Sequence, residues 1–307
     1  MRPASIAHRI VRYSGLPFLF REVLFRKATR IIMFHDPTPE AFDRAVAYLA
    51  GRYNIITLDD HLSGRPLPAK PLIITFDDGH IGNFALLDVF KKHGIRPTIF
   101  LCAGIVGTNR HFWFTHTAMR GSSGPLKSLP DDERLRVLEA SGFTPEREFD
   151  THQALQRTHI ETMKSHVDFQ SHGLTHALLP TCADHVAARE LTDSKRLLEG
   201  LLGTPVTAFA FPNGDYCERD IRLAQEAGYR CAVTVDFGFN RRGSDPFRLK
   251  RLSVDDTGDI DALSAKVSGV WAVLNAITGK RPLSRAKRRP VFVAVQALAA
   301  RLVLCMP

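Results

Sequence analysis

Cysteine is scarce in this chain: five of its 307 residues are cysteines, and none of them forms a CxxC pair. An odd, small number in a long chain argues against a disulfide framework and against a zinc site built from thiolates, so we expect buried free thiols. The amino-terminal segment also lacks a long apolar run, because Arg2, His8, Arg9 and Arg12 interrupt it. It therefore does not resemble a secretory signal. We expect a cytoplasmic protein, either free or peripherally attached to the cytoplasmic face of the membrane.

Acidic residues are outnumbered by basic ones, 32 to 41, which leaves a formal net charge of +9. The excess cations gather in residues 2–30 and 280–301. Solubility alone accounts for such charge, although basic patches also attract nucleic acid and anionic lipid. No nucleic-acid-binding motif accompanies the charge, so we expect no nucleic-acid partner. The apolar stretch 290–307 predicts either a tail helix packed on the core or a helix lying on an anionic membrane.

Short apolar runs alternate with amphipathic helical patterns along most of the chain, which predicts an α/β fold with about seven parallel strands. The runs that read as strands are 30–34, 53–57, 71–76, 96–101, 167–170, 206–211 and 231–235. Periodicity does not separate an open sheet from a closed barrel. The segment 106–165 breaks the alternation and predicts a mostly helical insertion.

The same pattern predicts three parts of the chain. Residues 1–29 form an amphipathic helical extension, residues 30–265 form the main domain, and residues 266–307 form a basic, helical tail. We find no internal repeat and no low-complexity tract.

Two adjacent carboxylates, Asp77 and Asp78, end the strand predicted at 71–76, and Gly79 follows them. The carboxyl ends of parallel strands carry the active sites of α/β folds. Adjacent side chains point in different directions, so one carboxylate can face a metal ion and the other a substrate. Two alternatives remain open for this pair: an Asp-Gly turn with solvated acids, and a magnesium-binding acidic pair of the kind found in phosphotransfer proteins.

Two histidines, His172 and His176, are spaced so that one helical turn places both imidazoles on one side. Chance accounts for such a pair among 13 histidines. Together with one aspartate, however, they form a candidate His₂-carboxylate metal site with open positions. A divalent cation there would lower the pKa of its bound water and polarise a carbonyl. The second aspartate could then serve as a general base.

A third feature is the turn Pro212-Asn213-Gly214, which ends the apolar run at 206–211. Such a turn can present a backbone N–H as an oxyanion donor. An ordinary turn after a strand is the alternative interpretation.

These three motifs, in this order, resemble those of the polysaccharide deacetylases, the NodB-homology class related to carbohydrate esterase family 4. Thr75–Gly79 reads T-F-D-D-G, Ser171–His176 reads S-H-G-L-T-H, and Phe209–Gly214 reads F-A-F-P-N-G. The resemblance extends over about residues 30–254. It implies a deformed (β/α) barrel and metal-dependent hydrolysis of the acetamide of an N-acetylated sugar, which is polymeric, lipid-linked or nucleotide-linked. Acetate and a free amino sugar would be the products.

The resemblance also implies a role for each motif residue. Asp77 is the expected general base. Asp78, His172 and His176 are expected to hold a divalent metal, usually zinc, with cobalt or nickel as alternatives. The backbone N–H of Asn213 is expected to help bind the oxyanion.

The sequence departs from the family pattern at four places. Gly173 stands where the family's S-H-[ST]-x-x-H motif has serine or threonine. Ala210 stands where many members have an arginine that braces the catalytic acid, and Asn213 stands where many have an aromatic residue. The late L-x-x-H motif, whose histidine acts as general acid, is not found in 247–254. His35 and His80 are candidates to replace it, and each could instead be a turn histidine or a partner that orients a catalytic group.

Two other functions fit the same residues. The chain could be an amidase acting on a non-sugar amide, or a non-catalytic homologue that binds a glycan or a protein partner. Metal-dependent release of acetate from an N-acetylated sugar would discriminate among the three.

Overall fold

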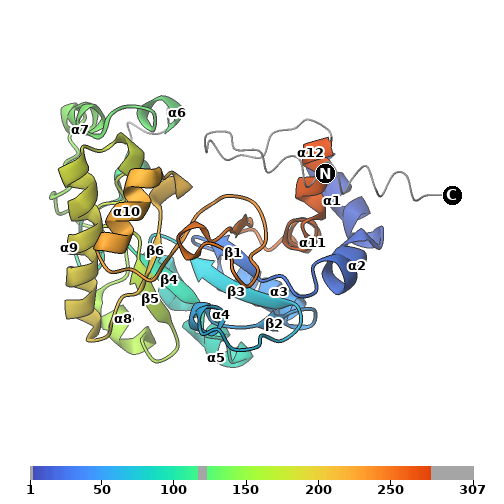
Figure 1. Ribbon diagram of the computed structural model, residues 1–307. Helices are drawn as coiled ribbons and strands as arrows, with labels where there is room; N and C mark the ends of the chain where they lie inside the picture. Colours follow the sequence, from blue (N-terminus) through green and yellow to red (C-terminus); the bar gives the residue numbers. More distant parts are fainter. Residues whose placement is uncertain (1–2, 117–122, 278–307) are drawn as a thin grey trace.

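The computed structural model describes residues 3–116 and 123–277 (Figure 1). Seven strands form one curved sheet in the order β7-β6-β5-β4-β3-β1-β8, and the short strand β2 pairs with the amino end of β3. All of these pairings are parallel. The strands are β1 (Arg30–Phe34), β2 (Asn54–Ile55), β3 (Pro71–Phe76), β4 (Thr98–Leu101), β5 (Asp168–Ser171), β6 (Ala208–Ala210), β7 (Cys231–Val233) and β8 (Leu252–Ser253).

One segment, residues 249–253, joins the two edges of this sheet. Leu249 pairs with Val233 in β7, and Leu252 pairs with Ile32 in β1. The segment thus lies between the last strand of the sheet and the first. The sheet is therefore curled into a deformed (β/α) barrel, as the family resemblance led us to expect.

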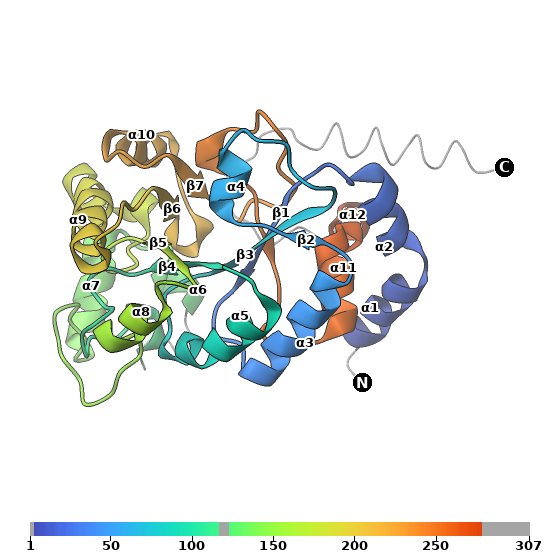
Figure 2. The ribbon, with the colours of Figure 1, turned by 90° about the horizontal axis from the view of Figure 1, so that it is seen from below.

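Helices surround the barrel (Figures 1 and 2). Those that follow individual strands or precede the next one are α3 (Pro39–Ala50), α4 (Leu58–Leu62), η2 (Ile81–Leu86), α5 (Leu87–His93), α8 (Arg157–Met163), η5 (Leu179–Thr181), α9 (Asp184–Leu202), η6 (Pro212–Gly214), α10 (Glu218–Glu226) and η7 (Pro246–Arg248). A separate group lies together on one side of the molecule in both views: α1 (Pro3–Tyr13), α2 (Leu16–Leu19), the π-helix η1 (Phe20–Leu24), α11 (Ile260–Ser268) and α12 (Val270–Ile277).

The expected insertion, residues 106–165, contains the helices η3 (Trp113–Thr115), α6 (Ser123–Leu126) and α7 (Asp131–Ala140), and also α8 directly before β5. It contributes no strand to the sheet within the part of it that the structure describes. The expected tail begins inside α11 and continues as α12. The apolar stretch 290–307 lies outside the described residues.

The seven expected strands are present, with shorter bounds at several ends. The run 96–101 becomes a strand only at Thr98, because Pro97 has no N–H to donate to a neighbouring strand. The helix expected at 83–93 is divided into the 3₁₀-helix η2 and α5. The sequence did not predict the strand β8, since it contains only two residues, one of them a serine, and directly follows Arg251.

Both faces of the sheet are buried, which explains why its strands read as continuous apolar runs. In β3, Ile73 faces the barrel interior, where it packs with Ile31, Phe100 and Leu249. Its neighbours in β3 face outward and join the larger core between the sheet and the helices. The alternation continues past the end of the strand, so Asp77 has the same facing as Ile73.

The four described cysteines are free thiols, as expected, and no cysteine pair among them is bonded. Cys217 differs from the others because it is exposed rather than buried. None of the helices in the described ranges has the length and apolar character needed to cross a membrane.

We predict that Phe42→Ala strongly lowers the free energy of unfolding. Phe42 is fully buried, and its ring packs against those of Phe34, Phe76 and Phe90. Loss of a buried phenylalanine side chain costs about 3–5 kcal/mol. Chemical denaturation measures the change, with Phe237→Ala as control: that side chain is 39% exposed and its loss should cost less than about 1 kcal/mol. Similar values for the two variants would contradict the assigned core.

Candidate active site

The site begins where β3 ends and the chain turns sharply. Asp78 has a φ of 72° and Gly79 a φ of 75°, both in the left-handed region. A Cβ atom at Gly79 would lie 2.5 Å from the Leu101 side chain, so only glycine fits there. The turn separates the two adjacent carboxylates: Asp77 continues the interior face of the strand, while Asp78 points toward β5.

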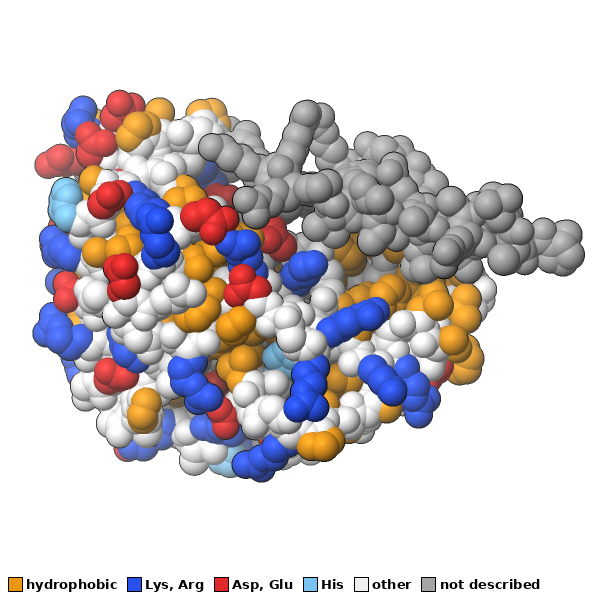
Figure 3. All heavy atoms as spheres, in the orientation of Figure 1, with side chains coloured by type: hydrophobic (Ala, Val, Ile, Leu, Met, Phe, Trp, Pro, Cys, Tyr) orange, Lys and Arg blue, Asp and Glu red, His pale blue; other side chains and the backbone are white. Residues whose placement is uncertain are grey.

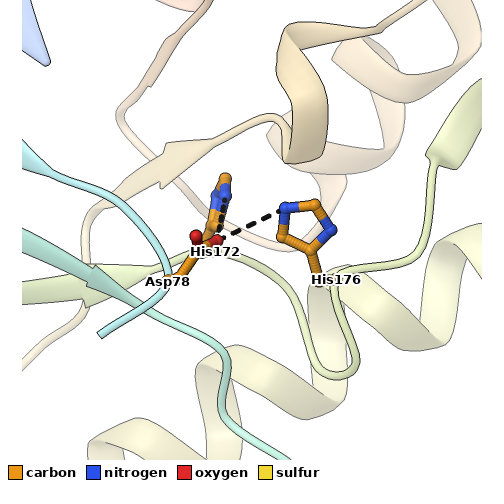
Figure 4. A group of neighbouring side chains, drawn as sticks. All are labelled: Asp78, His172 and His176. Carbon is orange, nitrogen blue, oxygen red and sulfur yellow. Dashed lines mark ion pairs between the residues drawn. The ribbon is translucent and has the colours of Figure 1, made fainter. Parts of the chain in front are cut away.

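Asp78, His172 and His176 form a compact, buried cluster (Figure 4). Their potential ligand atoms all lie within 4.8 Å of one another. The Oδ1 atom of Asp78 is 3.4 Å from the Nε2 atom of each histidine. These side chains come from two different strand ends, so the sheet rather than a single helical turn brings them together.

The cluster has the properties of a metal site. Asp78 Oδ1 is buried and accepts no hydrogen bond from any described residue, which is costly for a carboxylate oxygen unless a cation completes its environment. His172 Nδ1 donates a hydrogen bond to the carbonyl oxygen of Ala210 at 2.8 Å, and this fixes the ring with Nε2 toward the cluster. Two imidazoles and one carboxylate form a donor set typical of zinc.

Backbone strain is concentrated at this site. Four non-glycine residues in the described ranges have a positive φ, and three of them are Asp78, His176 and Asn213. Such conformations cost about 1–3 kcal/mol each and persist only where surrounding contacts impose them. All three residues belong to the motifs singled out in the sequence.

One buried acid holds the loop between the two histidines. Glu190, from α9, accepts hydrogen bonds from the backbone N–H groups of Leu174 and Thr175 and from the Thr175 hydroxyl. Gly173 has a φ of 84°, and a Cβ atom there would lie 2.9 Å from a Glu190 carboxylate oxygen. The glycine that departs from the S-H-[ST]-x-x-H pattern is therefore required by the local packing. Sequence reasoning missed Glu190, because nothing distinguished it from the other charges of an amphipathic helix.

Asp77 is bound by a buried arginine. Arg251 donates to Oδ1 at 2.6 Å through Nη1 and to Oδ2 at 2.8 Å through Nη2, which is a bidentate pair. Arg251 belongs to the segment that closes the barrel, 174 residues further along the chain. Sequence reasoning missed this residue as well, because it searched the region 247–254 only for a histidine.

The surroundings set the ionisation of each group. Burial by itself would raise the pKa of Asp77, but the charges of Arg251 and His172 outweigh it and hold that pKa below its ordinary value. Burial likewise opposes ionisation of Asp78, yet the facing imidazoles keep its pKa well below the ordinary value. Burial lowers the pKa of His176 to about 3. Burial also acts to lower the pKa of His172, but the two aspartates outweigh it and raise that pKa.

The other expected site residues lie around this cluster in different roles. His80 Nε2 donates to Asp78 Oδ2 at 3.1 Å, so His80 orients a metal-ligand candidate. His35 follows β1, next to β3; its carbonyl accepts from the buried Asn83 at 2.8 Å and its N–H donates to Asp256. The half-buried His35 imidazole is near enough to contribute to the low pKa of Asp77. Asn213 lies in the turn after β6, where its side chain accepts a hydrogen bond from Lys127.

Aromatic residues of the insertion cover one side of the cluster. Trp113 is buried, and its indole N–H donates to the carbonyl oxygen of His176 at 2.9 Å. The ring of Phe114 lies 4.6 Å from that of His176. Trp113 is thus a buried packing residue that fixes the position of His176.

Comparison with known proteins agrees with this geometry. The family model described as "Polysaccharide deacetylase" matches residues 64–232, more than half of the chain. This chain belongs to the polysaccharide deacetylase family. The match includes both aspartates, both histidines and the Pro-Asn-Gly turn.

Individual relatives are distant. YxkH of Bacillus subtilis (strain 168), whose name places it among the polysaccharide deacetylases, is 23% identical over 186 residues, which are 60% of this chain and 52% of YxkH. The chain thus matches about half the length of this curated relative.

Solved structures share the fold at low identity. The deacetylase PplD of Streptococcus pyogenes, determined in complex with acetate, has a TM-score of 0.56 and 20% identity, and the match covers 78% of this chain and 99% of PplD. IcaB of Ammonifex degensii has a TM-score of 0.58 and 19% identity, and the match covers 78% of this chain and 97% of IcaB. These similarities confirm the fold.

In this polysaccharide deacetylase, Arg251 takes the place of the arginine that many family members have at the position of Ala210. In the family pattern this arginine stands two residues before the motif proline, a position that is the last residue of β6 in this chain. The arginine that contacts Asp77 comes instead from the closing segment beside β1. Ala210 still contributes to the site, because its backbone carbonyl oxygen accepts the hydrogen bond from His172 Nδ1.

We predict that His80→Ala weakens zinc binding about 10- to 100-fold, because it removes the hydrogen bond that orients Asp78. Competition with a zinc-chelating dye at neutral pH measures this affinity. His93→Ala is the matched control, since His93 also bonds an aspartate, Asp43, but outside the site. Equal zinc affinities for His80→Ala and the wild type would contradict the proposed orienting contact.

Proposed function

We propose that this protein hydrolyses the acetamide of an N-acetylated sugar and releases acetate. The proposal rests on one observation: a candidate metal site and an ionised carboxylate lie next to each other at the end of β3. Asp78 faces two histidines in a buried cluster, and the adjacent Asp77 is held as a carboxylate by Arg251. Amide hydrolysis needs both a site that polarises the carbonyl and a base that takes a proton from water.

Asp78, His172 and His176 would hold the divalent cation, and we propose zinc, with cobalt or nickel as substitutes. The neutral, buried His176 and the oriented Nε2 of His172 suit this role. When bound there, the cation supplies a Lewis acid that polarises the acetamide carbonyl and makes a water molecule more acidic.

Asp77 would act as the general base and take the proton of the attacking water on a carboxylate oxygen. Arg251 fixes the orientation of that carboxylate and keeps it ionised. Arg251 is therefore a positioning residue that acts through Asp77.

His35 would give a proton to the departing amine. Its imidazole is half-buried at the end of β1, the strand next to β3, and its backbone is fixed by Asn83 and Asp256. His80 is less suited to this role because its Nε2 is already bonded to Asp78. The backbone N–H of Asn213, in a turn at the end of β6, would help to bind the oxyanion.

The proposed substrate class rests on the family and on one structure with the same fold. PplD, which shares the fold, was determined with acetate bound. We propose an N-acetylhexosamine unit as the substrate; its linkage to a polymer, lipid or nucleotide is for the assay to determine. The cytoplasmic location stays a prediction.

We predict zinc- or cobalt-dependent release of acetate from N-acetylglucosamine oligomers or from nucleotide-linked N-acetylhexosamine, measured by an enzyme-coupled acetate assay. Asp77→Asn removes the base and should lower the rate at least about 100-fold. His172→Ala should lower both zinc affinity and rate. Asp88→Asn is the control, because that side chain is almost fully exposed and remote from the site.

Two other outcomes would overturn the proposal in different ways. Stoichiometric zinc binding without acetate release from any N-acetylated sugar would indicate a different amide substrate. Failure to bind zinc or cobalt at all would favour a non-catalytic homologue.

We predict that Arg251→Met shifts the acid limb of the pH profile of kcat/KM to higher pH. Arg251 lowers the pKa of Asp77, so its removal raises that pKa, and the base is then ionised only at higher pH. At neutral pH we expect about a 10- to 100-fold loss of activity. Arg248→Met, which removes a neighbouring arginine bonded to Glu218, should leave the profile unchanged. Circular dichroism verifies that both variants fold, and an unshifted acid limb in folded Arg251→Met would refute the assigned role.

A further inference from the structure

Exposed apolar side chains are concentrated at the amino-terminal end of the chain. Ten large hydrophobic side chains are exposed in the described ranges, and seven of them lie between residues 6 and 23. These seven, which we call the amino-terminal patch, are Ile6, Ile10, Tyr13, Leu16, Phe18, Leu19 and Val23. Ile10 is 66% exposed and Phe18 is 61% exposed. Figure 3 shows hydrophobic side chains gathered at this edge of the molecule.

The helices that carry the patch are apolar on two sides. Their inner side, which includes Val11 and Phe20, packs against Ala265 and Val270 of α11 and α12. On the outer side, Ile6, Ile10 and Tyr13 follow the i, i+4, i+7 spacing of one helix face. Leu16, Leu19 and Val23 repeat this pattern with i, i+3, i+7 spacing. Contacts among the described residues account for the inner side only. A contiguous outer patch of this kind marks an interaction surface.

Cations surround the patch. Residues 3–27 contain five arginines and lysines and a single acid, Glu22. Glu22 is already paired with Arg21 and Lys70. Arg9 and Lys27 are exposed and make no ion pair with another described residue. The surface therefore presents apolar side chains together with unneutralised positive charge.

The positive charge around the patch indicates which kind of partner binds there. A second copy of the chain would bring two sets of cations together, which is repulsive. Residues 278–307 contain seven arginines and lysines and no aspartate or glutamate, so their charge is also of the wrong sign. An anionic lipid surface offers both an apolar interior and negative charge.

We propose that α1, α2 and η1 form a surface that binds an anionic lipid bilayer, with the amino-terminal patch inserted at the headgroup–acyl boundary. Such helices lie in the interface and do not span the bilayer. Near the end of η1, Glu22 is bonded to Lys70, which directly precedes the amino end of β3. The candidate active site lies at the opposite, carboxyl ends of the strands, so a bilayer bound here leaves that site uncovered. This inference does not depend on the proposed reaction.

The test is sedimentation of the full chain with vesicles of phosphatidylcholine alone or mixed with phosphatidylglycerol. We expect binding to the mixed vesicles that decreases with added salt. Ile10→Gln/Phe18→Gln should weaken it at least about tenfold. Arg9→Gln/Lys27→Gln should weaken it about fivefold for each cation removed.

The control is Val137→Gln/Leu197→Gln, which changes two exposed apolar residues on α7 and α9 and should bind like the wild type. Circular dichroism and thermal unfolding verify that all variants fold. Three results would overturn the proposal: no binding to the mixed vesicles, equal binding by Ile10→Gln/Phe18→Gln and the wild type, or a dimer in sedimentation equilibrium that the same variant abolishes.

Discussion

The buried pair of Asp77 and Arg251 connects the closure of the barrel to the candidate chemistry. A carboxylate inside a barrel is unfavourable unless a cation compensates it, and here a bidentate guanidinium does so. Arg251 reaches Asp77 only because the segment 249–253 lies between β7 and β1. Closure of the sheet and ionisation of the expected base thus depend on the same few residues.

The metal-ligand candidates depend on a second set of constraints. Asp78 and His176 both have left-handed backbone conformations that a non-glycine residue rarely adopts. The turn after β3, the Glu190 hydrogen bonds and the indole of Trp113 hold these conformations in place. Strain of this kind is typical of sites in which ligand direction matters more than local stability.

The amino-terminal helices add a feature that the barrel does not require. Arg30 is buried at the start of β1, and its guanidinium donates to the carbonyl oxygens of Phe25, Ala28 and Val267, which attaches these helices to the barrel. Their inner face completes a small core with α11 and α12, while their outer face remains apolar. The sequence predicted either a packed tail helix or a membrane-bound helix at residues 290–307, which lie outside the described residues. The membrane surface that we propose lies at the other end of the chain.

The class of fold, the family resemblance and the motif residues could all be predicted from the sequence. Doubly buried strands leave continuous apolar runs such as Pro71–Phe76, and polar residues directly after those runs must lie at one edge of a parallel sheet. These are local signals, so the sequence alone is enough to group Asp78, His172 and His176. Closure of the sheet was expected only from the family resemblance and not from periodicity, and the contacts of Arg251 with Asp77 and of Glu190 with the histidine loop became visible only in the folded structure. Those contacts join residues far apart in the chain, and a charged residue looks the same in a sequence whether it faces water or a buried partner.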